Sequence, residues 1–292
     1  MAVIKTENLT HVYSPGTSFQ KVAVDNVSIE INEGDFIGLI GHTGSGKSTL
    51  IQHLNGLLEP TEGKVYIDGE DMWADKTKIR NFRFKVGLVF QYPEYQLFEE
   101  TVFKDIAFGP KNMGLDEKEI TKRVYESAKA VGLDASLMEK SPFELSGGQK
   151  RRVAIAGVLA MEPRVLILDE PTAGLDPLGR EVILNLIKKY HDEKNQTIIL
   201  VSHSMEDVAR YAEKVLVMNE SKVFDFDTVD NVFKNSEEIE KIGLSVPQIT
   251  RIAIGLNNKG FNIDKGIYTV DAAKKAIMNI LKDKQKGGGK NA

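Results

Sequence analysis

The stretch Gly41-His42-Thr43-Gly44-Ser45-Gly46-Lys47-Ser48-Thr49 decides the fold of this chain of 292 residues. It lies between an apolar run at 36–40, typical of a strand, and a segment at 49–58 that is typical of a helix. Four residues separate Gly41 from Gly46, a spacing at which backbone N–H groups can turn inward around phosphate oxygens. The helix that follows points its N-terminus at the same anion. The stretch therefore predicts a phosphate-binding P-loop.

Two side chains of this loop carry the expected chemistry. Lys47 would reach the β- and γ-phosphates, and the Ser48 hydroxyl would ligate Mg²⁺, so MgATP or MgGTP is the expected ligand. A glycine-rich turn with a chance lysine is the plainer alternative, and the flanking strand and helix patterns favour the P-loop over it. The residues expected to bind the nucleotide are Gly41, His42, Thr43, Gly44, Ser45, Gly46, Lys47, Ser48 and Thr49.

Composition and charge exclude several classes of protein. The chain is 41% hydrophobic and 27% charged, as in globular proteins, and without cysteine it can form neither disulfides nor thiolate metal sites. The net charge of −4 and the pI of about 5.9 give no overall positive field to attract nucleic acid or anionic lipid. The first residues lack the apolar core of a signal peptide, and the longest apolar runs, 165–168 and 198–201, are too short to span a bilayer. Any membrane role therefore needs a partner subunit.

The chain opens as a small β layer. Residues 3–9 alternate apolar and polar side chains, and residues 22–31 repeat that pattern after the turn-forming segment 14–17. Tyr13 lies near the mouth of this hairpin, where its ring could stack on a nucleotide base or simply pack against the protein. Residues 64–68 read as a further short strand.

A glutamine and an aromatic cluster follow the strand predicted at 86–90. The amide of Gln91 could reach Mg²⁺ or the attacking water, although an ordinary polar loop residue explains it equally well. Such an aromatic segment usually packs into the protein or offers anchors to a partner. The cluster consists of Tyr92, Tyr95, Leu97 and Phe98, beside Pro93.

The chain is then largely helical from about 101 to 144. Residues 116–131 predict a helix, because apolar side chains recur on one face and Gly132 is a plausible stop. Asp116, with Glu119 three residues later, resembles a capping box at the start of this helix.

A second glycine-rich corner precedes a helix pattern at 150–159. Leu145-Ser146-Gly147-Gly148-Gln149 places two glycines behind a serine, which at a helix N-terminus can bind an anion. The same pentapeptide could be a flexible turn, and the residues alone leave both interpretations open.

Polar side chains follow two predicted strands. The apolar run 165–168 suits a central parallel strand buried on both faces, and Asp169 and Glu170 follow it directly. Asp169 can hold Mg²⁺, and Glu170 can orient or deprotonate the water that attacks the γ-phosphate. Surface carboxylates are the alternative, which the buried strand and the P-loop disfavour. His203 follows the strand predicted at 197–201 and could bond the γ-phosphate, although a lone histidine is more often structural.

The composition changes beyond about residue 235. Residues 247–256 and 272–281 predict short amphipathic helices, which could form an appendage packed on the main domain or an oligomer contact. Residues 284–292 predict a disordered tail.

Taken together and in this order, these motifs resemble the nucleotide-binding subunit of an ABC transporter over about residues 1–230. The resemblance implies that Tyr13 stacks on the base, that Gln91 is the Q-loop residue and that His203 is the switch histidine. Asp176, in Ala173-Gly174-Leu175-Asp176, would contact the second subunit. The residues that would contact the ATP held by that subunit are Ser146, Gly147, Gly148 and Gln149.

A narrower resemblance is to the ATPases of energy-coupling factor (ECF) transporters, which import vitamins and transition-metal ions. It rests on the loop 90–98, the opening 13–19, the Gly41-His42-Thr43 form of the P-loop and the helical extension. The last three are similar to the A-prime type of the two paralogous ATPases in vitamin-type complexes. The implied partners are the other ATPase in a heterodimer, a transmembrane coupling subunit and a substrate-binding membrane subunit, with no nucleic acid. The implied location is the cytoplasmic face of the cell membrane, as a peripheral protein.

The implied fold is an α/β P-loop NTPase of the ABC ATPase type. A RecA-like core with an N-terminal antiparallel β layer would span 1–234, with a helical subdomain inserted at about 95–160. The helical extension 235–283 would contact a second ATPase. The residues implied in catalysis are Glu170, His203, Gln91 and Lys47, and those implied at Mg²⁺ are Ser48, Gln91 and Asp169.

Two other functional classes share these motifs. A soluble ABC-type ATPase acting on DNA or ribosomes would need a long coiled coil or two motif sets, whereas the stretch 91–145 is short and one set is present. The ATPase of a conventional importer differs mainly in the aromatic loop and the C-terminal extension. The expected function is ATP hydrolysis coupled to uptake by an ECF-type importer.

Overall fold

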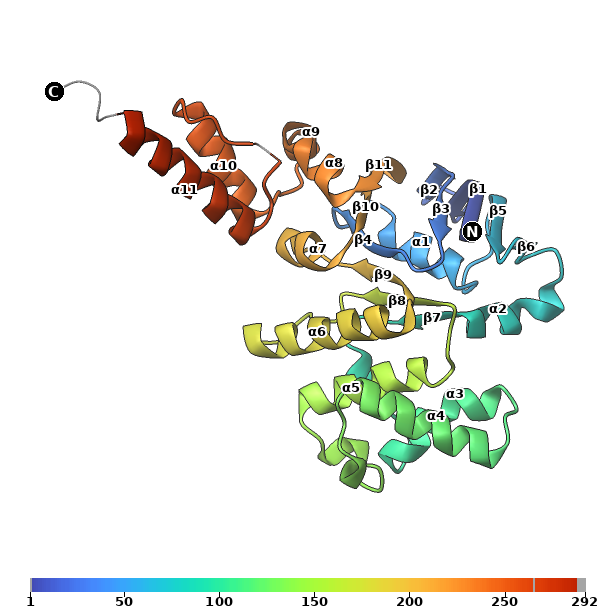
Figure 1. Cartoon of the computed structure of the whole chain (residues 1–292). Coiled ribbons are helices and arrows are strands. Elements are labelled where there is room, and N and C mark those ends of the chain that lie inside the picture. Colours follow the sequence, from blue (N-terminus) through green and yellow to red (C-terminus); the bar gives the residue numbers. More distant parts are fainter. Residues whose placement is uncertain (1, 265, 288–292) are drawn as a thin grey trace.

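The structure is a computed structural model that describes residues 2–264 and 266–287 (Figure 1). Within these residues the larger sheet is six-stranded, in the order β11-β10-β4-β9-β8-β7. All neighbouring strands are parallel except β11, which pairs antiparallel with β10. The strands are β4 (Phe36–Gly41), β7 (Val86–Val89), β8 (Val165–Asp169), β9 (Thr197–Val201), β10 (Lys214–Asn219) and β11 (Lys222–Thr228).

Strand β4 is the central strand that leads into the P-loop. All of its residues are buried, because β9 and β10 pair with its two edges and helices cover both faces. Helix α1 (Lys47–Leu54) begins two residues before the predicted start and ends before the predicted end. Gly46 caps it at φ +103°, and a Cβ there would lie 2.2 Å from the Ala23 carbonyl oxygen. Only glycine fits this position.

The smaller sheet is the predicted antiparallel β layer. The segment predicted as one strand at 22–31 is two strands, because β2 pairs with the end of β1 whereas β3 pairs with its beginning. The register of the β1–β2 pair also shifts between Leu9 and Val12, where β2 carries the extra residues of a β-bulge. The strands are β1 (Ala2–Tyr13), β2 (Lys21–Val27), β3 (Glu30–Asn32), β5 (Glu62–Ile67) and β6 (Glu70–Asp71).

Helices lie between β7 and β8, within the span predicted for the helical subdomain, and gather at one end of the molecule (Figure 1). Asp116 caps α4 by accepting from the Glu119 amide, but the predicted capping box is wrong, because the Glu119 carboxylate pairs with Arg123 instead. A complete capping box is found at Ser146 and Gln149, where α5 begins. The α-helices of the first two thirds of the chain are α2 (Ile79–Lys85), α3 (Val102–Asn112), α4 (Glu117–Ala130), α5 (Gly147–Leu159) and α6 (Pro177–Lys194).

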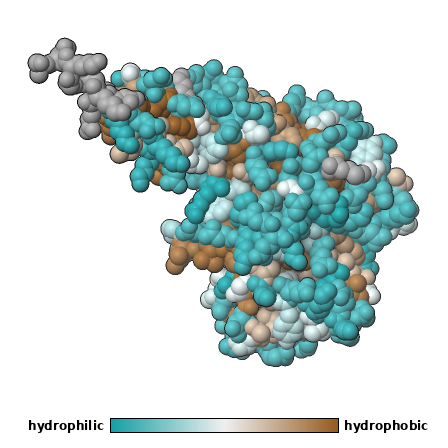
Figure 2. All heavy atoms as spheres, viewed as in Figure 1, coloured by the Kyte–Doolittle hydropathy of each residue, from teal (hydrophilic) through white to brown (hydrophobic). Residues whose placement is uncertain are grey.

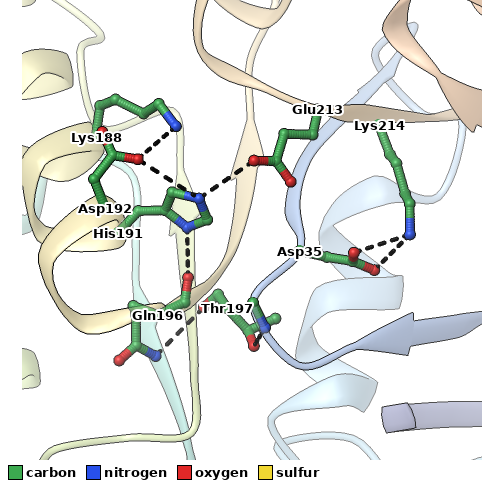
Figure 3. A network of polar contacts seen from close by, with 9 residues as sticks. Asp35, Lys188, His191, Asp192, Gln196, Thr197, Glu213 and Lys214 are labelled. Carbon is green, nitrogen blue, oxygen red and sulfur yellow. Dashed lines mark hydrogen bonds and ion pairs between the residues drawn. The ribbon is translucent and has the colours of Figure 1, made fainter. Parts of the chain in front are cut away.

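A polar network ties together the amino ends of β4, β9 and β10 (Figure 3). His191, near the end of α6, contacts the Gln196 carbonyl oxygen through Nδ1 at 2.7 Å. Lys214 Nζ lies 2.9 Å from both carboxylate oxygens of Asp35, and the Thr197 hydroxyl accepts from the Gly34 amide. These contacts satisfy polar groups at the edge of the sheet opposite to the P-loop.

The C-terminal region starts inside the main core. Ile239, Leu244 and Val246 share a buried cluster with residues of β4, β10 and α7 (Met205–Tyr211). Helices α10 and α11 then project at one corner, and Figure 2 shows apolar side chains gathered on them. Exposed apolar residues there include Ile252, Val270, Met278 and Leu281. The helices are α8 (Val229–Lys234), α9 (Ser236–Lys241), α10 (Gln248–Asn258) and α11 (Val270–Gly287).

Helix α11 is the last element of the described chain. It continues to Gly287, beyond residue 284 where the tail is predicted to begin, and residues 288–292 of that prediction lie outside the described residues. Within the described residues, no helix combines the length and the apolar character needed to cross a membrane.

Candidate nucleotide site

A cavity of about 400 Å³ opens at the carboxyl ends of β4 and β8. The P-loop, which follows β4, and the residues at the end of β8 line it. It brings together most of the predicted nucleotide, metal and catalytic side chains, which lie far apart in the sequence. Parallel strands end at one edge of the sheet, which explains this convergence. The cavity is lined by Tyr13, Lys21, Ala23, Thr43, Gly44, Gly46, Lys47, Ser48, Thr49, Gln91, Asp169, Glu170 and His203.

Lys47 supplies a buried positive charge to this cavity. Its side chain is buried, and Nζ donates to the carbonyl oxygens of Gly41 and His42 at 2.6 and 2.8 Å. Burial lowers the pKa of Lys47, while the negative charges of Glu170 and Asp169 act in the opposite direction. The ammonium group is thus held beside the loop that would surround a phosphate.

Glu170 is held from both sides. His203 Nε2 lies 2.8 Å from its Oε1, and Gln91 Nε2 donates to its Oε2 at 3.0 Å. The backbone of Glu170 has φ +47°, a conformation that is uncommon outside glycine and is concentrated at functional sites. Gln91 and His203, both predicted for catalysis, therefore each contact Glu170 directly.

Asp169 lies in the same cavity and has the environment of a metal ligand. Burial raises the pKa of the Asp169 carboxyl group, and the nearby Glu170 carboxylate raises it further. A cation would relieve both effects. Ser48, Gln91 and Asp169 all line the cavity, and their hydroxyl, amide and carboxylate oxygens are the hard ligands that Mg²⁺ prefers. The donor set fits the predicted ion.

Tyr13 stands at the rim of the cavity, at the end of β1. Its side chain is 40% exposed, and its hydroxyl lies 3.3 Å from the hydroxyl of Thr49 on α1. Tyr13 thus has both a structural contact and an accessible ring.

None of the described residues that line the cavity belongs to the pentapeptide 145–149. Ser146 accepts from the Gln149 amide through Oγ, and the Ser146 amide donates to Gln149 Oε1, so these side chains fix the start of α5. At Gly147 and Gly148 a Cβ would meet no described heavy atom within 4 Å. Packing within the chain therefore does not require glycine at either position.

Arg151, which the sequence interpretation missed, joins three parts of the site. It is 2% exposed, and its guanidinium binds both carboxylate oxygens of Glu94 at 2.9 and 2.6 Å. It also donates to the carbonyl oxygens of Pro171 and Ala173. Helix α5 is thereby connected to the aromatic loop and to the segment after Glu170.

The aromatic loop after Gln91 divides into a packed part and an exposed part. Leu97 is buried, whereas Tyr95 is 83% and Phe98 58% exposed. The Phe98 ring packs edge-on against Phe108, 4.9 Å away. The loop thus presents aromatic side chains at the surface from a fixed position.

The P-loop also contacts the C-terminal extension. The His42 ring contacts the Ile242 carbonyl oxygen through Nε2, and a Cβ at Gly243 would lie 3.3 Å from this ring. The Gln248 amide donates to Glu206 on α7, the helix that follows His203. Nothing in the local sequence pattern predicts either contact.

The sequence is similar to those of known proteins. The sequence model of the family described as ABC transporter matches residues 24–173. The energy-coupling factor transporter ATP-binding protein EcfA2 of Clostridium perfringens is 59% identical over 281 residues, covering 96% of this chain and 99% of that protein. The protein of the same name from Clostridium acetobutylicum is 60% identical over 279 residues, covering 95% and 98%.

Solved structures are similar as well. The structure of cbiO1 from Clostridium perfringens, described as part of the ABC transporter complex cbiONQ, has a TM-score of 0.74 and 40% identity, covering 88% of this chain and 99% of that one. The dimeric post-hydrolysis structure of the ATP-binding cassette MJ0796, bound to ADP and Pi, has a TM-score of 0.68 and 32% identity, covering 77% and 98%. The predicted fold class is confirmed.

Proposed function

The chain belongs to the ABC transporter family, as an ATP-binding and ATP-hydrolysing subunit of the energy-coupling factor type, and we propose that a second ATPase completes its nucleotide site. The main support comes from the pentapeptide 145–149, which lies outside the cavity and has free space beside Gly147 and Gly148. Glycines that no internal contact requires are explained if the ATP of a second subunit approaches them closely. The dimer of MJ0796 with ADP and Pi supports this arrangement.

Within this site the residues of the chain have separate roles. Lys47 binds the β- and γ-phosphates, and Glu170 orients or deprotonates the attacking water. His203 and Gln91 hold the two Glu170 oxygens and so fix the direction in which this base points. Ser48, Gln91 and Asp169 would hold Mg²⁺, which supplies charge neutralisation at the phosphates when it is bound.

Closure of the two ATPases around ATP would deliver the work of the transporter. A ligand that binds the closed dimer better than the open one shifts the population toward closure, and hydrolysis reverses that shift. Gln91 contacts Glu170 at the phosphate end, and the aromatic loop that follows is tied to α5 through Arg151. This loop would therefore transmit closure to a membrane partner.

The partners proposed for this chain follow its ECF-type relatives. They are a paralogous ATPase in a heterodimer, contacted by the C-terminal extension, a transmembrane coupling subunit, and a membrane subunit that binds the vitamin or other micronutrient. The chain would lie peripherally on the cytoplasmic face of the cell membrane. Affinity purification from detergent-solubilised membranes tests this assignment, because a soluble ATPase or a conventional importer ATPase would co-purify with different chains.

The composite site can be tested at Gly148. We expect Gly148→Ala to leave ATP binding by this chain unchanged and to lower hydrolysis by the assembled ATPase pair about tenfold, since overpacking an interface costs about 1–3 kcal/mol. The measurement is steady-state phosphate release by the assembled pair. Gly157→Ala, on the same helix, is the control, because its Cβ meets only ordinary contacts at 3.7 Å. Equal activity of both variants would contradict the composite site.

The aromatic loop can be tested separately. We expect replacement of Tyr95 and Phe98 by serine to spare ATP binding but to lose assembly with the membrane subunits, because each buried aromatic anchor is worth about 2 kcal/mol. Co-purification and transport into vesicles are the measurements. Phe224→Ser, on β11, removes an exposed aromatic ring elsewhere and should leave both unchanged. Undiminished assembly and transport of the double variant would refute the role of the loop.

A further inference from the structure

A row of three aromatic rings leads from the buried face of α1 to the rim of the nucleotide cavity. The His11 ring meets the Tyr13 ring edge-on, with centroids 4.5 Å apart and planes inclined by 76°. On its other side the His11 ring meets His53, with centroids 4.7 Å apart. His53 is fully buried, so the row has a fixed inner end and an accessible outer end.

The row follows from the periodicities of a strand and a helix. His11 and Tyr13 are two residues apart on β1, and their ring contact shows that they share a face. Thr49 and His53 are four residues apart on α1 and therefore also share a face. Each residue of the first pair meets one of the second, because the Tyr13 hydroxyl lies 3.3 Å from the Thr49 hydroxyl and His11 packs on His53. The Tyr13 ring is consequently held both at its hydroxyl and at its side.

The two histidines contribute to this row through the packing of their aromatic rings. Burial lowers the pKa of His53 to about 4, and the neighbouring His11 ring lowers it as well, so the inner ring is neutral near pH 7. His11 Nδ1 is buried and has no hydrogen-bond partner within the described part of the chain. An aromatic ring without these nitrogens should therefore be able to replace His11.

We propose that His11 is a positioning residue that holds the Tyr13 ring in the orientation in which it stacks on the base of ATP. The inference rests on the proposed ATP-binding function and on the stacking of Tyr13 on the base that the family resemblance implies. His11 itself would not touch the nucleotide. Its contribution is to restrict the motion of the Tyr13 ring before binding, so that less conformational entropy is lost when the base binds.

The test compares MgATP with inorganic tripolyphosphate in the presence of Mg²⁺, a ligand that has phosphates but no base. The full chain carries His11→Ala, His11→Phe, Tyr13→Ala or the control Val12→Ala, which shortens the next side chain of the strand. We expect His11→Ala to weaken MgATP about threefold to tenfold, as for loss of one aromatic pair, and to leave tripolyphosphate unchanged. His11→Phe should restore the affinity for MgATP, and Val12→Ala should not alter it. Calorimetric titration measures all of these dissociation constants.

The outcomes separate this inference from the proposed role of Tyr13. If Tyr13→Ala leaves MgATP binding unchanged, the assignment of base stacking to Tyr13 is wrong, and the positioning role of His11 is overturned as well. If Tyr13→Ala weakens MgATP but His11→Ala does not, base stacking stands and the positioning role is overturned. Equal weakening of both ligands by His11→Ala would show general damage to the fold and would also overturn it. If His11→Ala does not fold, His11→Leu must bind MgATP more weakly than His11→Phe.

Discussion

The variant Glu170→Gln should bind MgATP normally and hydrolyse it about a thousandfold more slowly, which lies within the range for loss of a positioned general base. Glutamine keeps the size of the side chain, and its single amide oxygen can still accept from either His203 or Gln91, so one of the contacts at 2.8 and 3.0 Å can be kept. It cannot accept a proton from the attacking water. Because closure needs ATP and reopening needs hydrolysis, the assembled ATPase pair should accumulate in the closed, ATP-bound form.

Single-turnover phosphate release and the nucleotide content of the isolated dimer measure this effect. Glu162→Gln is a matched control, because Glu162 is also a glutamate with a left-handed backbone, at φ +51°, and it pairs with Arg123 outside the cavity. The control should hydrolyse ATP at the normal rate. Near-normal turnover by Glu170→Gln would show that another group positions the water.

The variant Lys47→Ala should fail one step earlier, at binding. The ammonium group is buried beside the P-loop carbonyls of Gly41 and His42, and its transfer to the phosphates would form charge-assisted hydrogen bonds worth about 1.5–3 kcal/mol. We therefore expect MgATP affinity to fall about a hundredfold at the upper end of this range. Equilibrium titration of the full chain with MgATP is the measurement.

A lysine outside the cavity provides the control for charge. Lys64 pairs with Asp71 on the N-terminal β layer, and Lys64→Ala should not change the affinity for MgATP. The contrast with Glu170→Gln is also informative, since one variant should bind without turnover and the other should hardly bind. Wild-type affinity in Lys47→Ala would be incompatible with the assigned role of this side chain.

Much of the site could be predicted from sequence because its geometry follows from local patterns. The spacing from Gly41 to Lys47 is set by the P-loop backbone, and the apolar strands before Asp169 and His203 place both residues at one edge of a parallel sheet. These relations need no knowledge of distant contacts. The structure accordingly brings most of the predicted residues into one cavity.

The residues that were missed depend on contacts between distant parts of the chain. Arg151 lies in the run Lys150-Arg151-Arg152, a pattern typical of a solvated basic surface, yet it is 2% exposed. Its burial is explained only by the approach of Glu94 and of two carbonyl groups from other segments. The prediction of one strand at 22–31 was wrong for a similar reason, because its two parts pair with opposite ends of β1.

The contact between His42 and Ile242 joins positions that are 200 residues apart in sequence. The free energy of this contact depends on the conformations of both the P-loop and the C-terminal extension. Thermodynamic reciprocity then applies: if bound nucleotide strengthens or weakens this contact, a protein bound to the extension must change nucleotide affinity by the same factor. Binding of a protein to the extension and binding of nucleotide to the P-loop would therefore be thermodynamically coupled.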